Sequence, residues 1–222
     1  MLLPSAFYPH AECIAKHLPH LRPSQVRGLA LWVGATILAR SSCQNAVLGA
    51  LLTLGLGWHT TRQYLREWLR DGADRAAPCR VQLDVDACFA PLLRWVLAWW
   101  QGPELTLAID PTAKGEALVA LVVSVVYRGL AIPGAWRIKT GGQPGPWMPD
   151  LCDLLDHLGP VVPPHMTVRV LCDRGLQSPR LWQAIRRQGW HPYMRLRTPH
   201  DLPTNPRTPL AGRAAREPRG PP

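Results

Sequence analysis

The sequence predicts an α/β protein, in which a helical first half precedes a mixed sheet flanked by helices. Three observations predict this class. Apolar residues recur at helical spacing from residue 23 to about 100, strand-like runs follow one another after Pro103, and helices then alternate with strands up to residue 197. The chain has 222 residues, of which 47% are hydrophobic, so it can bury a sizeable core.

Residues 1 to about 100 are expected to be all-helical. One helix begins at Pro23-Ser24, with Ser24 available as a cap, and a second passes through Val47 and Leu54. A helix from about Asp84 to Trp100 ends this half, and its three tryptophans are expected to be packing aromatics. Residues 1–20 show little pattern, and residues 72–80 are predicted to be a connection.

A further helix is predicted between the one that passes through Leu54 and the one that begins at about Asp84, and it carries a basic stripe. Thr60 and Gln63 have capping-box spacing, which predicts that the helix begins near Thr60. One face carries three arginines at every fourth position, namely Arg62, Arg66 and Arg70. Such a stripe is compatible with a helix presented to DNA, and a solvated arginine face explains it equally well.

After Pro103 three strand-like runs succeed one another with short connections. They are Leu105–Asp110, Ala117–Tyr127 and Leu130–Ile138. Consecutive strands joined by short turns predict an antiparallel meander. Pro133 cannot donate a ladder hydrogen bond, so its strand is predicted to lie at an edge of the sheet.

The remaining elements alternate between helix and strand. A helix over residues 150–158 has a leucine face, a strand runs from Val168 to Asp173, a helix begins at Ser178-Pro179, and a strand spans His191–Arg197. The first of these helices carries Asp150, Asp153 and Asp156 on its polar face. These aspartates are expected to form a solvated surface rather than a metal site.

Two aspartates stand where central strands are predicted to end. A meander followed by helix, strand, helix and strand is the element order of a ribonuclease H-like fold, in which the first and fourth strands are parallel neighbours. Asp110 and Asp173 would then lie side by side. Carboxylate oxygens suit Mg²⁺ (or Mn²⁺), although a single aspartate at a strand end is often only a turn residue.

Composition limits the partners and the compartment. The net charge is +10, and 22 of the 25 basic residues are arginines, since only Lys16, Lys114 and Lys139 are lysines. This balance favours a polyanion such as nucleic acid as the partner, although arginine content also follows genomic base composition.

The six cysteines form no C-x-x-C pair and are expected to be buried thiols. With neither a secretory signal nor a membrane-spanning run recognised, we expect a soluble cytoplasmic protein.

Several stretches resemble the insertion-sequence DDE transposases of the IS-four type. They are LAIDPT at 107–112, VVSVVYRGLAIP at 122–133 and LCDRGLQSPRLWQAIRRQGWHPYMR at 171–195. The stretch RQYLREWL at 62–69 is similar to the helical region of that family that binds DNA ends. The resemblance covers most of residues 20–197, and the D-x-T and D-R-G elements are its specific parts.

This resemblance implies a catalytic site and a partner. Asp110 and Asp173 would be the first two acids of the DDE triad and would hold two Mg²⁺ ions. Arg174, Arg186 and Arg187 would lie near DNA phosphates, with plain surface charge an equal explanation for the last two. The partner would be double-stranded DNA carrying terminal inverted repeats, bound by a homodimer at the bacterial nucleoid.

The sequence departs from the family in its third acid. Glu217 is the sole glutamate after Asp173, and it lies in a stretch, residues 199–222, whose seven prolines and lack of apolar periodicity predict disorder. We therefore expect a helical DNA-end-binding domain at 1–100, a partial catalytic domain at 101–198 and a frameshifted ending. Such a truncated chain would bind terminal DNA weakly and cleave it poorly or not at all.

A non-enzymatic DNA-binding remnant or regulator of transposition is the alternative function, and a ribonuclease H-like nuclease is a third possibility.

Overall fold

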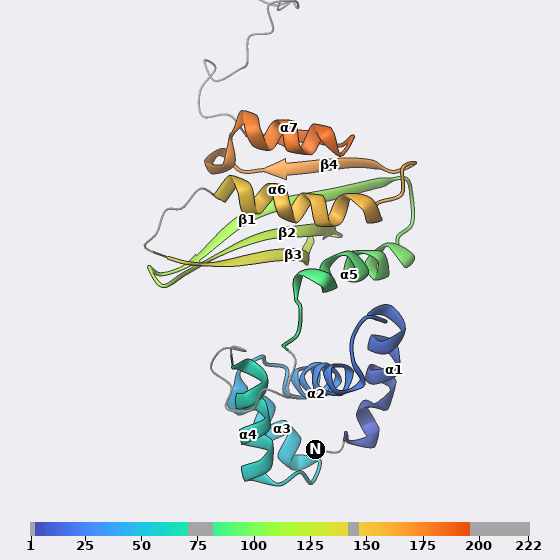
Figure 1. Ribbon diagram of the computed structural model, residues 1–222, viewed down its shortest axis with the longest axis vertical. Coiled ribbons are helices and arrows are strands. Elements are labelled where there is room, and N and C mark those ends of the chain that lie inside the picture. The colour runs from blue at the N-terminus through green and yellow to red at the C-terminus, as the bar shows by residue number, and fades with distance from the viewer. Residues whose placement is uncertain (1–2, 71–81, 142–146, 196–222) are drawn as a thin grey trace, which may run out of the picture.

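The computed structural model describes residues 3–70, 82–141 and 147–195 (Figure 1). Five strands form one sheet in the order β3-β2-β1-β4-β5. The strands are β1 (Glu104–Lys114), β2 (Leu118–Tyr127), β3 (Leu130–Thr140), β4 (Thr167–Cys172) and β5 (His191–Met194). The predicted α/β class with a mixed sheet is confirmed, and the arrangement is compatible with a ribonuclease H-like fold.

The pairing of the strands follows the predicted meander. β2 is antiparallel to both β1 and β3, whereas β4 is parallel to β1 and β5 is parallel to β4. Pro133 lies in the edge strand β3, as predicted, opposite a register shift at Val123/Ser124. One boundary was wrong. β1 continues past Asp110 to Lys114, because β2 still runs beside it after its β4 neighbour has ended.

Three helices cover one face of the sheet. They are α5 (Asp86–Ala98), α6 (Trp147–Leu158) and α7 (Pro179–Arg187). In Figure 1, α6 lies in front of the sheet and crosses β1, and it also contacts β2 and β3. Alternate strand residues point toward these helices and are fully or almost fully buried, among them Leu105, Leu107, Ile109, Leu121, Val123, Val168 and Val170. The four leucines predicted on the inner face of α6 are all buried.

The opposite face of the sheet is open. Because side chains alternate along a strand, Ala108 and Asp110 of β1 and Leu171 of β4 point away from the buried core. Leu171 and Tyr193 are 40% and 53% exposed there, and among the described residues no helix packs over them. Any ligand that reaches the carboxyl ends of β1 and β4 on this side meets bare sheet.

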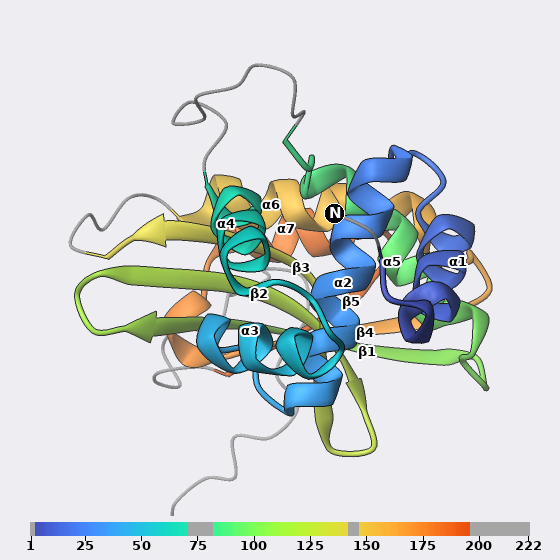
Figure 2. The same cartoon turned by 90° about the horizontal axis from the view of Figure 1, so that it is seen from below.

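The described part of the first half of the chain is mainly helical, as expected. It contains α1 (Tyr8–His17), α2 (Pro23–Ala39), α3 (Gln44–Thr53) and α4 (Trp58–Leu69), which form the layer nearest the viewer in Figure 2. Close packing depends on Gly34, since a Cβ there would meet the ring of Phe7 at 2.5 Å. No helix was predicted before residue 20, so α1 was missed.

Three local predictions in this half were wrong. Arg22 is the N-cap of α2, so Ser24 lies inside the first turn and does not cap the helix. α4 begins at Trp58 with Gly57 as its N-cap, so Thr60 lies inside the first turn and does not cap the helix. Of the tryptophans in and after α5, Trp95 stacks on His17 at 4.6 Å, but Trp99 is 79% exposed and packs little. The short helix ends before Trp99 and leaves its ring in solvent.

Helix α5 contacts both halves of the molecule. Trp95 stacks on α1 through His17, and Cys88 Sγ lies 3.6 Å from His20 Nε2. On its other side Phe89 packs edge-on against Trp136 of β3, with ring centroids 4.9 Å apart.

No described helix is long and apolar enough to cross a membrane. The predicted connection at 72–80, the end of the last predicted strand and the tail at 199–222 lie outside the described residues.

Candidate functional site

Asp110 and Asp173 occupy adjacent positions on neighbouring strands. The last parallel pair of the β1–β4 ladder is Ile109 with Cys172, and each aspartate is the next residue of its chain segment. Both aspartates are exposed, and alternation places them on the open face of the sheet. The hydroxyl of Thr112 donates to Asp110 Oδ2 at 3.3 Å. The parallel pairing of these strands, predicted from element order, is confirmed.

An open depression of about 460 Å³ adjoins the aspartates. Asp173 lines it together with Tyr193 and Arg195, which come from β5 and the residue after it. Four residues of β1 and β4 also line it, namely Ala108, Ile109, Leu171 and Cys172. Asp110 does not line it but directly follows Ile109, which does. The depression therefore combines a carboxylate, a guanidinium and an aromatic ring.

The two aspartates offer a partial metal site. Their carboxylate oxygens are the hard ligands that Mg²⁺ and Mn²⁺ prefer. Among the described residues they belong to no group of three or more candidate ligands, so no third acid, histidine or cysteine joins them. Open coordination positions on such an ion would be available to water or to substrate oxygens.

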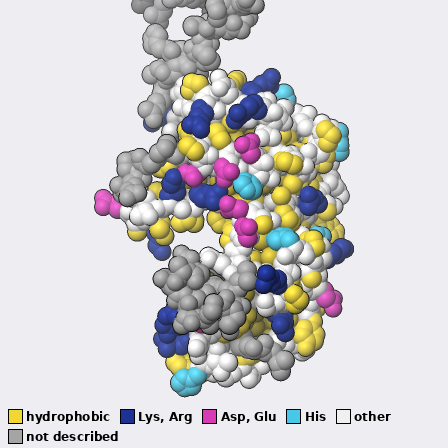
Figure 3. Space-filling view, in the orientation of Figure 1, with side chains coloured by type: hydrophobic (Ala, Val, Ile, Leu, Met, Phe, Trp, Pro, Cys, Tyr) yellow, Lys and Arg dark blue, Asp and Glu magenta, His cyan; other side chains and the backbone are white. Residues whose placement is uncertain are grey.

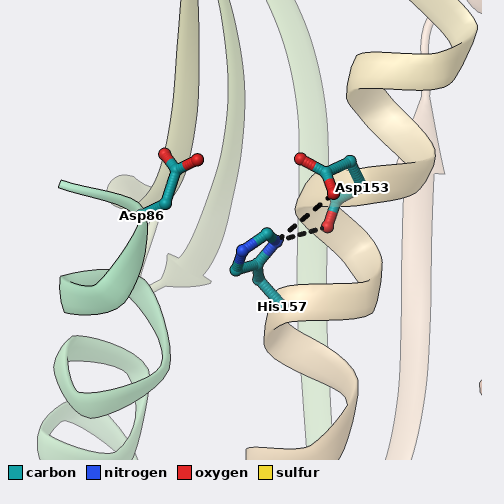
Figure 4. Close-up of side chains that lie close together, drawn as sticks. All are labelled: Asp86, Asp153 and His157. Carbon is teal, nitrogen blue, oxygen red and sulfur yellow. Dashed lines mark hydrogen bonds and ion pairs between the residues drawn. The ribbon is translucent and has the colours of Figure 1, made fainter. Parts of the chain in front are cut away.

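Sequence reasoning missed a second group of candidate ligands. One ligand atom from each of Asp86, Asp153 and His157 lies within 4.8 Å of the other two (Figure 4). Asp86 comes from α5, while Asp153 and His157 lie one turn apart on α6. Nδ1 of His157 is 2.8 Å from the carbonyl oxygen of Asp153, and 3.8 Å from its Oδ1.

A guanidinium already bridges the two carboxylates of this second group. Arg137 of β3 donates to Asp86 Oδ2 at 2.8 Å and to Asp153 Oδ2 at 2.6 Å. Burial disfavours the charged form of Arg137, but the two carboxylates outweigh it and raise its pKa. We therefore interpret the group as an ion-pair network that joins α5, β3 and α6. Asp153 was predicted to be plainly solvated, and this contact corrects that prediction.

The other two aspartates of α6 are also paired. Lys139 of β3 lies 2.5 Å from Asp150 Oδ2, and Gln188 donates to Asp156 Oδ1 at 2.6 Å. All three aspartates thus contact side chains of neighbouring elements, although Asp153 and Asp156 are also exposed, as expected from their spacing.

We expect Arg137→Gln to lower the free energy of unfolding by about 1–2 kcal/mol, because it leaves two carboxylates facing each other. The expected loss is small because solvent screens these ion pairs: the side chains of Arg137, Asp86 and Asp153 are 29%, 36% and 51% exposed. Urea unfolding would measure it, with Arg94→Gln on α5 as the matched exposed control. A loss no larger than that of the control would show that the network contributes nothing.

The same network predicts indifference to zinc. Arg137 supplies the positive charge between Asp86 and Asp153, so Zn²⁺ should leave the unfolding midpoint of the wild type unchanged. It should raise the midpoint of Arg137→Gln, and His157→Gln in that background should remove the rise. A rise in the wild type that depends on His157 would instead identify a metal centre.

The predicted arginines of α4 lie along one shallow groove of about 360 Å³. Arg62 and Arg66 are exposed on the helix, and Arg70 follows its last residue. The guanidinium of Arg62 lies over the ring of Trp58, 5.1 Å from the centroid, and Arg70 pairs with Glu67 at 3.1 Å. Figure 3 shows basic side chains on this side of the helical half. Trp58 was missed because it precedes the predicted start of the helix.

The other predicted DNA-contacting arginines do not reach the depression. Arg174 follows Asp173 directly and begins the short 3-10 helix η4 (Arg174–Leu176), but it does not line the depression. Arg186 and Arg187 lie at the end of α7, which packs on the covered face of the sheet. The aspartates are on the opposite face, so these two arginines are not grouped with them.

The cysteines divide into buried and accessible thiols. Cys152 and Cys172 are buried as predicted, whereas Cys43 is exposed, which corrects the prediction for that residue. Burial raises the pKa of the Cys172 thiol to about 12. Its thiolate fraction at neutral pH is therefore about a thousandfold below that of a thiol with a pKa of 9.0.

This pKa predicts selective alkylation. At neutral pH iodoacetamide should modify Cys43 and leave Cys172 unmodified until the protein is denatured, as peptide mass spectrometry would show. Because Cys172 immediately precedes Asp173, its modification would also disturb the site. Rapid labelling of Cys172 in the folded protein would contradict the burial described here.

A scan against protein-family models and a search of the curated proteins find no match to this chain. The geometry of the strand ends therefore carries the functional argument, together with the charge of the helical half.

Proposed function

We propose that this chain is a DDE-type transposase with a ribonuclease H-like sheet, which binds insertion-sequence ends and takes part in metal-dependent strand cleavage and transfer. The single observation that carries the proposal is the register of the parallel β1–β4 pair. It ends at Ile109 and Cys172, so Asp110 and Asp173 follow at neighbouring positions on the open face. A basic chain with a net charge of +10 suits a DNA substrate.

Each part of the site has a distinct task. Asp110 and Asp173 would hold Mg²⁺ or Mn²⁺, and Thr112 orients Asp110 through its hydrogen bond. A bound divalent ion supplies Lewis-acid activation of a water or a DNA 3′-hydroxyl and charge stabilisation at the phosphodiester. The open face leaves room for DNA to approach the aspartates, while burial of Cys172 and Ile109 anchors the strand ends.

The helical half is proposed to hold the DNA end. Arg62, Arg66 and Arg70 line one groove on α4, and Trp58 fixes the first of them by a cation–π contact. Guanidinium groups spaced along a helix can contact successive phosphates of a duplex. This half would supply affinity and register, and the aspartates would supply the chemistry.

A non-enzymatic DNA-binding protein is the second candidate, and one observation favours it. Among the described residues, no third candidate ligand joins Asp110 and Asp173. In that case the α4 groove would bind terminal DNA, and the sheet would serve as a scaffold that regulates transposition without cutting.

Nicking of supercoiled plasmid separates the two candidates. The purified chain, incubated with Mg²⁺ or Mn²⁺ and plasmid carrying insertion-sequence ends, should convert supercoiled DNA slowly to nicked circles. A chelator should stop the conversion. Retarded mobility of the DNA without any nicking in either metal would reject the enzyme and leave the binding protein.

A further inference from the structure

We propose that Tyr193 and Arg195 form a nucleotide subsite beside Asp173, in which the tyrosine ring packs on a base and the guanidinium contacts a phosphate of a single DNA strand. The inference rests on the proposed function, which supplies the nucleic acid. It goes beyond that function in two respects. It specifies that the DNA reaching the aspartates is single-stranded, and it gives a binding role to two residues that were not predicted as site residues from the sequence.

The backbone places both residues beside the aspartates. Tyr193 pairs in register with Leu171 of β4, two residues before Asp173. The N–H of Arg195 donates to the carbonyl oxygen of Cys172 at 3.2 Å, so the ladder continues one residue beyond β5. Tyr193, Arg195 and Asp173 consequently line one depression.

The ring of Tyr193 is exposed and lies near a guanidinium that is itself fixed by an ion pair. Arg169 donates two hydrogen bonds to Glu104, at 2.8 and 2.6 Å, which fixes its guanidinium across β1 and β4. Tyr193 contributes, after Glu104, to the raised pKa of Arg169, so the two side chains lie near each other on this face. An aromatic side chain has only two rotatable bonds, so it loses little conformational freedom when a flat ligand packs on it.

The chemistry of the depression selects its occupant. Among the described residues, Arg195 forms no ion pair with a carboxylate, so its charge is available to an anion. An apolar peptide would bury that charge without a partner, and a free phosphate would make no use of the ring. A nucleotide unit satisfies both, because it carries a phosphate and a flat base.

The accessibility of bases favours a single strand over a duplex. Bases in a duplex stack on one another and present no free faces, whereas an unpaired strand exposes them to aromatic side chains. The depression is open to solvent along the sheet, so a strand can cross it and continue past Asp110. A frayed DNA end would present such a strand to the two aspartates.

The test is affinity for a fluorescein-labelled oligothymidylate, measured by anisotropy with the full chain in Ca²⁺. Tyr193→Ala should weaken binding about fivefold or more, while Tyr193→Phe, which keeps the ring, should lose less. Arg195→Gln should weaken binding and lower the salt slope by about 0.7. Tyr127→Ala and Arg128→Gln are matched controls, since this exposed pair lies at the other end of the sheet.

Several outcomes would overturn the subsite. The subsite would be rejected if both Tyr193→Ala and Arg195→Gln bound the single strand with wild-type affinity. It would also be rejected if these variants lost as much affinity for blunt duplex DNA, which offers no free base, as for the single strand. If Tyr193→Ala fails to fold, 4-thiothymidine crosslinking of the wild type replaces it. Crosslinks that map away from residues 108–110 and 171–195 would then count against the subsite.

The experiment also separates this inference from the proposed function. Nicking that depends on Asp110 together with unaffected strand binding would reject the subsite alone. Weakened strand binding in both variants without nicking in any metal would support the subsite and reject the enzyme.

Discussion

Asp110→Asn is expected to abolish metal-dependent nicking while leaving the affinity for duplex DNA unchanged. Asparagine keeps the size of the side chain and its contact with Thr112, but it removes the negative charge that holds a divalent ion. Losing several kcal/mol of electrostatic stabilisation corresponds to a decrease in rate of about a hundredfold or more. Quantified plasmid nicking in Mn²⁺, beside a binding assay in Ca²⁺, measures both quantities.

Asp173→Asn should have the same effect, since the two aspartates follow the last pair of one ladder. Asp156→Asn is the matched control. It removes one carboxylate from α6, which packs on the covered face of the sheet. Nicking that persists in Asp110→Asn but is lost in Asp156→Asn would place the chemistry elsewhere in the protein.

The second large effect is expected from the α4 groove. Replacing Arg62, Arg66 and Arg70 together by glutamine should weaken binding to terminal-repeat DNA by roughly tenfold to a hundredfold and reduce the salt slope by about 2–3. Each guanidinium that contacts a phosphate releases counterions, and Arg70 contributes less because it also pairs with Glu67. Fluorescence anisotropy over a range of salt concentrations measures both changes.

A matched variant tests whether net charge alone is responsible. Arg27, Arg94 and Arg128 are exposed on α2, α5 and the β2–β3 turn, so their joint replacement by glutamine removes the same charge elsewhere. If both triple variants lose equal affinity and slope, the groove has no special role. The arginine stripe would then be the solvated face that its spacing equally allowed.

The sheet could be predicted because its order follows from local signals. Short turns at Arg128-Gly129 and between residues 114 and 118 require antiparallel neighbours, and intervening helices permit parallel ones. The adjacency of Asp110 and Asp173 followed from that order. The true end of β1 did not, because continuation past Pro111 depends on β2 remaining alongside, which no local pattern records.

Features that depend on distant contacts were missed. Arg137 joins Asp86, 51 residues earlier, to Asp153, 16 residues later, and neither separation has a sequence signature. The helix over residues 8–17 buries a single residue, Ile14, so it offers few core positions from which a helical period could be recognised. Tyr193 and Arg195 become a candidate site only once β5 lies beside β4.

The contacts of helix α5 with both halves determine how cooperatively the protein unfolds. Its Trp95 is stacked on the helical half, while Asp86 and Phe89 are fixed to β3 and α6. This short helix therefore belongs to the packing of both halves. Fraying of α5 would loosen both halves together, so amide protons on either side of it should exchange in a single cooperative event.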